Sequence, residues 1–211
     1  MTARKSYLLV AVLFAWVALA LQFHIVVDRF LAEGSPFVEA VIRFASYFTV
    51  TTNTLVAVLL TLSLIRSPER APRPPIMAAA TVYIIVVGVI YYLLLSKSWN
   101  PQGLQLVANV GLHYVMPAVM IVYWLTFVPK GEARWSHAVR WLVYPLAFFG
   151  YTLIEGLRVN WYPYSFFDVT ALGYVKVAIN GFGLLVFFYA LNLIMIALDK
   201  TLGRPAIRQT A

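Results

Sequence analysis

The sequence contains no cysteine among its 211 residues. This absence excludes disulfide bonds and thiolate metal ligands, and it leaves the redox compartment undefined. Charged residues are also scarce. They make up 11% of the chain, whereas soluble domains carry roughly a quarter. A water-soluble globular domain is therefore not expected.

Hydrophobic residues account for 62% of the chain and gather in long runs. Stretches of about 20 apolar residues, the length that crosses a bilayer, recur from one end to the other. The basic start is followed by a run too long for a signal-peptide core and without a cleavage site, so it is interpreted as a permanent span. We predict an all-α, polytopic membrane protein, with residues 1–211 forming one integral membrane domain and a six-helix bundle. The expected spans are 6–27, 38–65, 76–96, 104–128, 138–158 and 170–198.

The net charge of +8 at first suggests a nucleic-acid partner. However, the cations lie in short loops between apolar runs, where they act as topology signals, so no nucleic acid is expected. They are concentrated at the amino end, in every second loop and in the tail, which predicts that both termini lie in the cytoplasm (N-in and C-in). A multi-pass protein of the bacterial inner membrane is expected. The cations concerned are Arg4, Lys5, Arg66, Arg70, Arg73, Lys130, Arg134, Arg140, Lys200, Arg204 and Arg208.

The stretch "YFTVTTNTLVAV" (47–58) places four threonines and one asparagine inside an apolar run. Polar side chains within a membrane are costly unless paired, so each is a functional candidate. A threonine commonly bonds back to a carbonyl of its own helix, which is the structural alternative for Thr49 and Thr52. Asn53 lies one turn after Thr49, and its amide favours a contact with another helix.

His113 lies in "ANVGLHYVMPAV", with Asn109 one turn before it and Pro117 one turn after. Pro117 has no N–H, so we expect a kink and an unpaired carbonyl at His113. Counting helix rise from the expected span ends places Thr49 and His113 at similar depths, about 14–18 Å. The two side chains are therefore expected to meet. A buried histidine that only bonds to a neighbouring helix is the alternative.

Three acidic–basic pairs lie near the ends of the predicted spans. They form either an ion-paired lid or a set of side chains that extend to the interface. We expect a carboxylate partner for Lys176, with Asn180 one turn further on. The pairs are Glu39–Arg43, Glu155–Arg158 and Asp168–Lys176.

Threonine and histidine together indicate acyl transfer. The imidazole takes the proton of the hydroxyl nucleophile and later returns it to the leaving group. Asn53 or Asn180 is a candidate oxyanion donor, and Asn109, Tyr114 or a freed carbonyl a candidate to orient His113. No metal and no cofactor is expected.

Three segments resemble the androgen-induced-gene-like integral membrane hydrolases, whose bacterial members are called predicted six-transmembrane proteins. These are "YFTV" (47–50) followed by Asn53, "NVGLHYVMP" (109–117) and "NWYPYSFFDVTALGY" (160–174). The resemblance implies a hydrolase of lipid esters such as fatty-acid esters of hydroxy fatty acids, with Thr49 as nucleophile and His113 as base. Where animal members have a second histidine, this chain has Val110.

Several alternatives remain open at this stage. Thr52 lies on nearly the same helix face as Thr49, so the register of the nucleophile is open by one turn. The segment 160–168 forms either the roof of a pocket or an aromatic belt at the interface. The polar cluster alternatively lines a path for a lipid, an ion or a proton. A haem protein with His24 and His113 as ligands is a further alternative.

Overall fold

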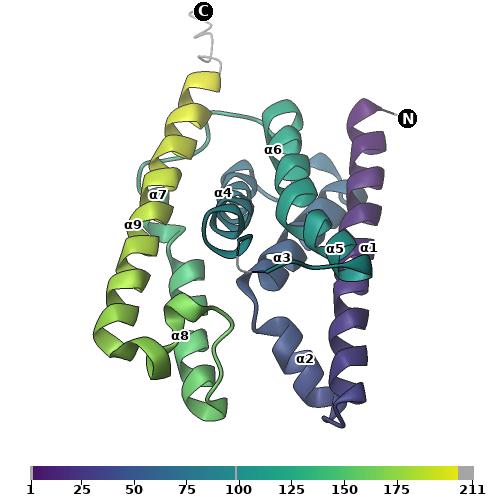
Figure 1. Cartoon of the computed structure of the whole chain (residues 1–211). Helices are drawn as coiled ribbons and strands as arrows, with labels where there is room; N and C mark the ends of the chain where they lie inside the picture. Colours follow the sequence, from purple (N-terminus) through teal and green to yellow (C-terminus); the bar gives the residue numbers. More distant parts are fainter. Residues whose placement is uncertain (1, 98, 204–211) are drawn as a thin grey trace, which may run out of the picture.

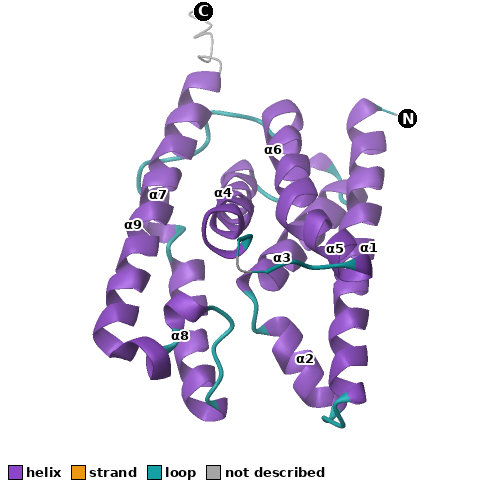
Figure 2. Cartoon of the chain, viewed as in Figure 1, coloured by secondary structure: helices purple, strands orange, loops and turns teal. Residues whose placement is uncertain are grey.

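A computed structural model describes residues 2–97 and 99–203 of the chain. Its regular elements in that part are helices, without strands (Figure 2). Six helices are long and apolar enough to cross a membrane, which confirms the predicted all-α, six-span architecture. The first of these begins, and the last one ends, at the same end of the bundle (Figure 1). The predicted cytoplasmic cations Arg204 and Arg208 lie outside the described residues.

The six spans differ from one another in their internal regularity. The first is the single helix α1 (Ala3–Ala32). The third joins α4 (Pro74–Ile90) to a π-helical segment (Tyr91–Leu95), after a short 3₁₀ turn (Pro68–Arg70). α4 lies in the middle of the bundle (Figure 1), where its small residues permit close packing. The fourth span consists of α5 (Gly103–Val110), a π-helical segment (Gly111–Val115) and α6 (Met116–Phe127).

The second span is not the continuous helix predicted over residues 38–65. These residues form α2 (Phe37–Ala45) and α3 (Phe48–Ile65), with Tyr47 extended between them (φ −98°, ψ 129°), and α3 is the helix long and apolar enough to cross a membrane. The hydroxyl of Ser46 donates to the Ile42 carbonyl at 2.8 Å and closes the end of α2. Local side-chain bonds of this kind compete with helix continuation. The break places Thr49 in the first turn of α3.

The helix irregularity predicted near Pro117 takes the form of a π-helical segment, Gly111–Val115. The N–H of Met116 donates to the Gly111 carbonyl, five residues back, and so leaves the carbonyl of Leu112 without its usual partner. Pro117 has no N–H to offer the carbonyl of His113. Two consecutive carbonyls are thus released from the helix ladder and become available to other groups.

The last two spans are joined by the aromatic segment 160–168. α7 (His137–Arg140) precedes α8 (Val143–Val159), and a 3₁₀ turn (Ser165–Phe167) leads into α9 (Val169–Leu202). Gly173 interrupts α9 with φ 75° and ψ 159°, a conformation that glycine adopts without a Cβ clash.

Asp168 caps the start of α9. Its carboxylate accepts the N–H groups of Thr170 at 2.9 Å and Ala171 at 3.1 Å. The carboxylate partner expected for Lys176 is not found: Lys176 is exposed and takes part in none of the ion pairs of the described chain. The prediction is wrong because the Gly173 turn leaves Lys176 on the outside of the bundle, while Asp168 is used by backbone amides.

Candidate active site

Thr49 and His113 lie side by side although 64 residues separate them in the sequence. The Thr49 Oγ1 atom is 3.2 Å from His113 Nε2. Thr49 is in the first turn of α3, and His113 is in the π-helical segment Gly111–Val115. π-helical turns often occur at functional sites, because the extra residue redirects neighbouring side chains.

The contact of the other ring nitrogen, Nδ1, indicates which of the two nitrogens of His113 carries the hydrogen. Nδ1 lies 3.1 Å from the main-chain carbonyl oxygen of Asn109. A carbonyl only accepts, so Nδ1 carries the hydrogen, and the lone pair of Nε2 faces the Thr49 hydroxyl. The Tyr91 ring stacks on the imidazole with 4.0 Å between centroids. The histidine is therefore held on one edge and one face, with its basic nitrogen toward the hydroxyl.

The side chain of Asn109 acts on Tyr91 instead of on His113. Its Nδ2 donates to the Tyr91 hydroxyl at 2.7 Å, and the residue is only 3% exposed. Tyr114 is largely exposed and lies edge-on to Tyr91. Of the three groups proposed to orient the imidazole, the one in contact with it is the main-chain carbonyl of Asn109.

Asn53 joins α3 to the π-helical segment of the fourth span. Its Nδ2 donates to the Thr49 carbonyl at 2.8 Å and to the Leu112 carbonyl at 3.2 Å. The second acceptor is one of the carbonyls released from the helix ladder. Since both amide hydrogens are used, Asn53 positions the two helices and has no hydrogen left for an oxyanion.

Asn180 and Lys176, the candidates from the last span, lie away from Thr49. Asn180 Nδ2 donates to the Phe166 carbonyl at 2.8 Å and so secures the segment 160–168. Neither residue lines the two cavities that adjoin Thr49. The structure therefore does not bring the expected oxyanion donor Asn180 to the nucleophile.

Thr52 is completely buried and faces α8. Its Oγ1 lies 3.1 Å from the hydroxyl of Tyr144, which also donates to Thr51 Oγ1 at 2.9 Å. Thr52 borders neither cavity near the histidine. The geometry therefore favours Thr49 over Thr52 as the reactive hydroxyl.

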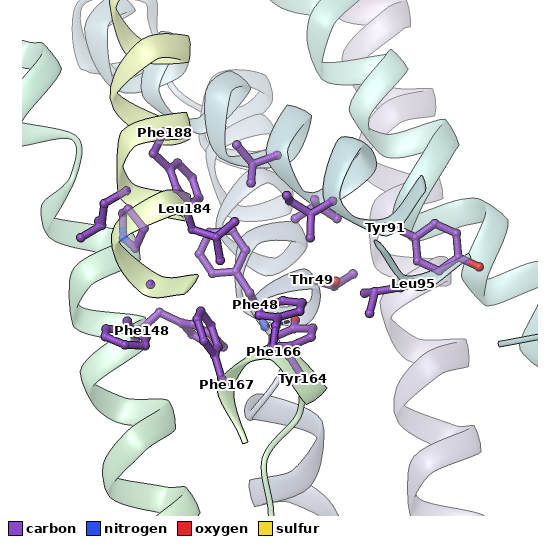
Figure 3. A pocket seen from close by; sticks show the side chains of 17 residues that line it. Phe48, Thr49, Tyr91, Leu95, Phe148, Tyr164, Phe166, Phe167, Leu184 and Phe188 are labelled. Carbon is purple, nitrogen blue, oxygen red and sulfur yellow. Dashed lines mark hydrogen bonds between the residues drawn. The ribbon is translucent and has the colours of Figure 1, made fainter. Parts of the chain in front are cut away.

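Two cavities adjoin at Thr49. The smaller has a volume of about 70 Å³ and the larger about 310 Å³. Figure 3 shows the smaller one, surrounded mainly by apolar side chains from α3, α4, α8, α9 and the segment 160–168. Four residues line both cavities, so a molecule that extends from one to the other must pass them. They are Thr49, Tyr91, Leu95 and Tyr164.

The larger cavity has polar residues from several helices on its wall. His113 and Asn109 line it from the fourth span, Arg29 from α1 and Arg43 from α2. No aspartate or glutamate lines it. The two cavities therefore differ in chemistry: one suits a hydrocarbon chain, and the other suits polar or negatively charged groups and water.

Tyr164 is a site residue to which the sequence assigned no role. Its hydroxyl accepts the N–H of Phe48 at 2.9 Å and also interacts with Thr49 (Figure 3). Burial raises the pKa of Tyr164, so the hydroxyl stays protonated, and it is hydrogen-bonded to the Thr49 side chain. The motif "NWYPYSFFD" was the only signal, and the structure folds it inward: Tyr162, Tyr164 and Phe167 are buried. The segment thus roofs the site.

No group of three or more histidine, aspartate or glutamate side chains suited to a metal ion occurs in residues 2–97 and 99–203. His24, one ligand of the haem alternative, is exposed, pairs with Asp28 at 3.3 Å and lines neither cavity. Comparisons with protein-family models, curated proteins and solved structures find no match to this chain.

Proposed function

We propose that the protein is an intramembrane lipid esterase that hydrolyses long-chain fatty-acid esters, such as fatty-acid esters of hydroxy fatty acids. One observation carries the proposal. The Thr49 hydroxyl is 3.2 Å from His113 Nε2, and the opposite ring nitrogen is held by the Asn109 carbonyl. A hydroxyl, a base and a group that orients the base are the parts that an activated nucleophile requires. The resemblance of three sequence segments to membrane hydrolases supports the same assignment.

In the first half of the reaction, Thr49 Oγ1 attacks the ester carbonyl while His113 Nε2 takes the hydroxyl proton. The tetrahedral intermediate then breaks its bond to the alcohol oxygen. His113 returns the proton to that oxygen, and the alcohol leaves. The acyl group stays on Thr49 as an ester.

In the second half, water attacks the acyl group on Thr49, and His113 takes one of its protons. Collapse of the second tetrahedral intermediate breaks the bond to Thr49 Oγ1, which recovers its proton from the imidazolium. The fatty acid leaves, and both residues are restored. The larger cavity, whose lining includes His113 and Asn109, is the route by which water reaches the acyl group.

Tyr164 and the amino end of α3 are the groups proposed to stabilise the oxyanion. The Tyr164 hydroxyl accepts the Phe48 N–H and is hydrogen-bonded to the Thr49 side chain. Once Thr49 has attacked the ester, the Tyr164 hydrogen turns to the negatively charged oxygen next to Thr49. The positive end of the α3 dipole lies in the same place. Preorganised donors of this kind typically contribute about 10²–10³ in rate.

The experiment is hydrolysis of a fluorogenic long-chain ester by protein purified in detergent. Thr49→Ala and His113→Gln are expected to reduce kcat by roughly 10³-fold or more, because each removes one member of the reacting pair. Thr49→Ser keeps a hydroxyl and retains measurable activity. Thr52→Ala is the matched control: it removes a neighbouring hydroxyl that faces Tyr144, and near-normal activity is expected.

Each variant is compared with wild type for its thermal unfolding, so that loss of fold is separated from loss of chemistry. If Thr52→Ala is inactive and Thr49→Ala is active, the nucleophile lies one turn away. If hydrolysis persists in Thr49→Ala, Thr52→Ala and His113→Gln, the polar cluster is structural. Liposome flux measurements then test the alternative of a lipid, ion or proton pathway.

A further inference from the structure

Arg43 lies on the wall of the larger cavity, which it shares with Thr49 and His113. Its guanidinium carbon is 3.4 Å from the ring centre of Trp161 and 5.5 Å from that of Phe30. Guanidinium groups stack on aromatic faces in this way while their N–H groups remain in the guanidinium plane. The aromatic contacts therefore hold the charge in position without using its hydrogen-bond donors.

Arg43 forms no direct ion pair in the part of the chain that the structure describes, and the carboxylates of Glu39 and Glu155 act on it only from a longer distance. Glu39, one turn earlier on α2, is exposed and makes no ion pair. Glu155 is taken by Arg158 at 2.7 Å. Burial and the neighbouring charge of Arg29 disfavour a cation that has no directly paired carboxylate, and an anion that enters the cavity relieves this cost.

A second cation strengthens the positive potential of the same cavity. Arg29 also lines it, although Glu33 pairs with Arg29 at 2.9 Å and neutralises part of its charge. The cavity wall contains no acidic residue. A cavity whose charged residues are all cations, and whose other lining residues are largely apolar, concentrates anionic ligands.

We propose that Arg43 binds an anionic group, a carboxylate or a phosphate, on the alcohol part of the ester, while the carbonyl end of the acyl chain enters the smaller apolar cavity. The proposal rests on the esterase function and specifies its substrate class. Thr49 borders both cavities, so the ester carbonyl lies beside it when the chain is on one side and the anion on the other. Carboxylate and phosphate both accept two parallel N–H bonds from a guanidinium.

The test compares charged and neutral members of two substrate pairs. One pair is a long-chain ester of a hydroxy fatty acid and its methyl ester. The other is a monoacylglycerol phosphate and the corresponding monoacylglycerol. Wild type is expected to hydrolyse the charged member of one pair with the higher kcat/KM, and the pair that shows the preference identifies carboxylate or phosphate as the anion.

Arg43→Gln is expected to lower kcat/KM for that charged substrate by about tenfold or more, mainly through KM, and to lower it much less for the neutral substrate. Arg43→Lys keeps the charge but loses the planar fork, so an intermediate effect is expected. Lys176→Gln is the matched control, because Lys176 is exposed, takes part in no ion pair of the described residues and borders neither cavity.

Equal kcat/KM of wild type for charged and neutral members overturns the proposal, as does an equal loss on both in Arg43→Gln. If folded wild type hydrolyses no long-chain ester, the esterase function fails. The anion site is then tested separately, by measuring the thermal unfolding midpoints of wild type and Arg43→Gln with a free long-chain fatty acid and with an alkyl phosphate. Stabilisation of wild type but not of Arg43→Gln supports the site, and equal stabilisation of both overturns it.

Discussion

The replacement of Gly88 by alanine tests how closely α4 and the histidine backbone are packed. A Cβ built on Gly88 would lie 2.9 Å from the main-chain carbonyl oxygen of His113 and 3.4 Å from Cγ of Pro117. Ordinary contacts begin at 3.4 Å, so the carbonyl and α4 have to separate. Both groups are part of a backbone, and no side-chain rotation relieves the contact.

Two opposing contributions determine the change in stability. Overpacking of this kind costs about 1–3 kcal/mol. Alanine in place of glycine inside a helix returns about 0.5–1 kcal/mol. We expect Gly88→Ala to lose about 1–2 kcal/mol in the free energy of unfolding and to lower the unfolding midpoint by about 2–8 °C.

The same displacement moves His113 relative to Thr49. A misplacement of about 1 Å costs roughly 10²-fold in rate, so a shift of part of that distance is expected to reduce ester hydrolysis about tenfold. Gly150→Ala on α8 is the control, because a Cβ there meets nothing within 4 Å. Wild-type stability and wild-type activity in Gly88→Ala would refute the close approach of the two backbones.

Two further predictions concern the oxyanion and the topology. Tyr164→Phe removes the proposed oxyanion donor, so kcat is expected to fall about 10²-fold or more with little change in KM, and an unchanged kcat in steady-state assays contradicts the role. Because the chain has no cysteine, single cysteines introduced as Ser35→Cys and Ser67→Cys report the orientation without background. In intact cells a membrane-impermeant maleimide is expected to label Ser35→Cys, and to label Ser67→Cys only after the membrane is permeabilised. The reverse labelling pattern would mean that both termini lie outside the cytoplasm.

The break in the second span shows where sequence periodicity stops being informative. Residues 38–65 contain neither proline nor glycine, so no helix breaker predicts an end at Ala45. The break is stabilised from a distance: the first amide of α3 is accepted by Tyr164, 116 residues later. Neither the break nor the catalytic potential of Tyr164 follows from local propensity, because both depend on a contact between distant segments.

Arg43 is a second case in which tertiary structure overrides sequence spacing. Glu39 and Arg43 are four residues apart, which favours an ion pair on a helix surface. In the structure, the ring of Trp161 occupies the face of the guanidinium at 3.4 Å, and Glu39 is left exposed. An exposed pair adds little free energy, so aromatic packing decides the position of the arginine.

The sequence by itself determined the six apolar spans and the polar candidates within them, because burial in a bilayer restricts composition residue by residue. It also singled out Thr49 and His113 by their depth. Tertiary structure alone decided which hydroxyl faces the imidazole, which carbonyl holds it, and which two cavities adjoin at Thr49. These features depend on the rotation of each helix and on carbonyls released at π-helical turns, and they arise only when the helices pack against one another.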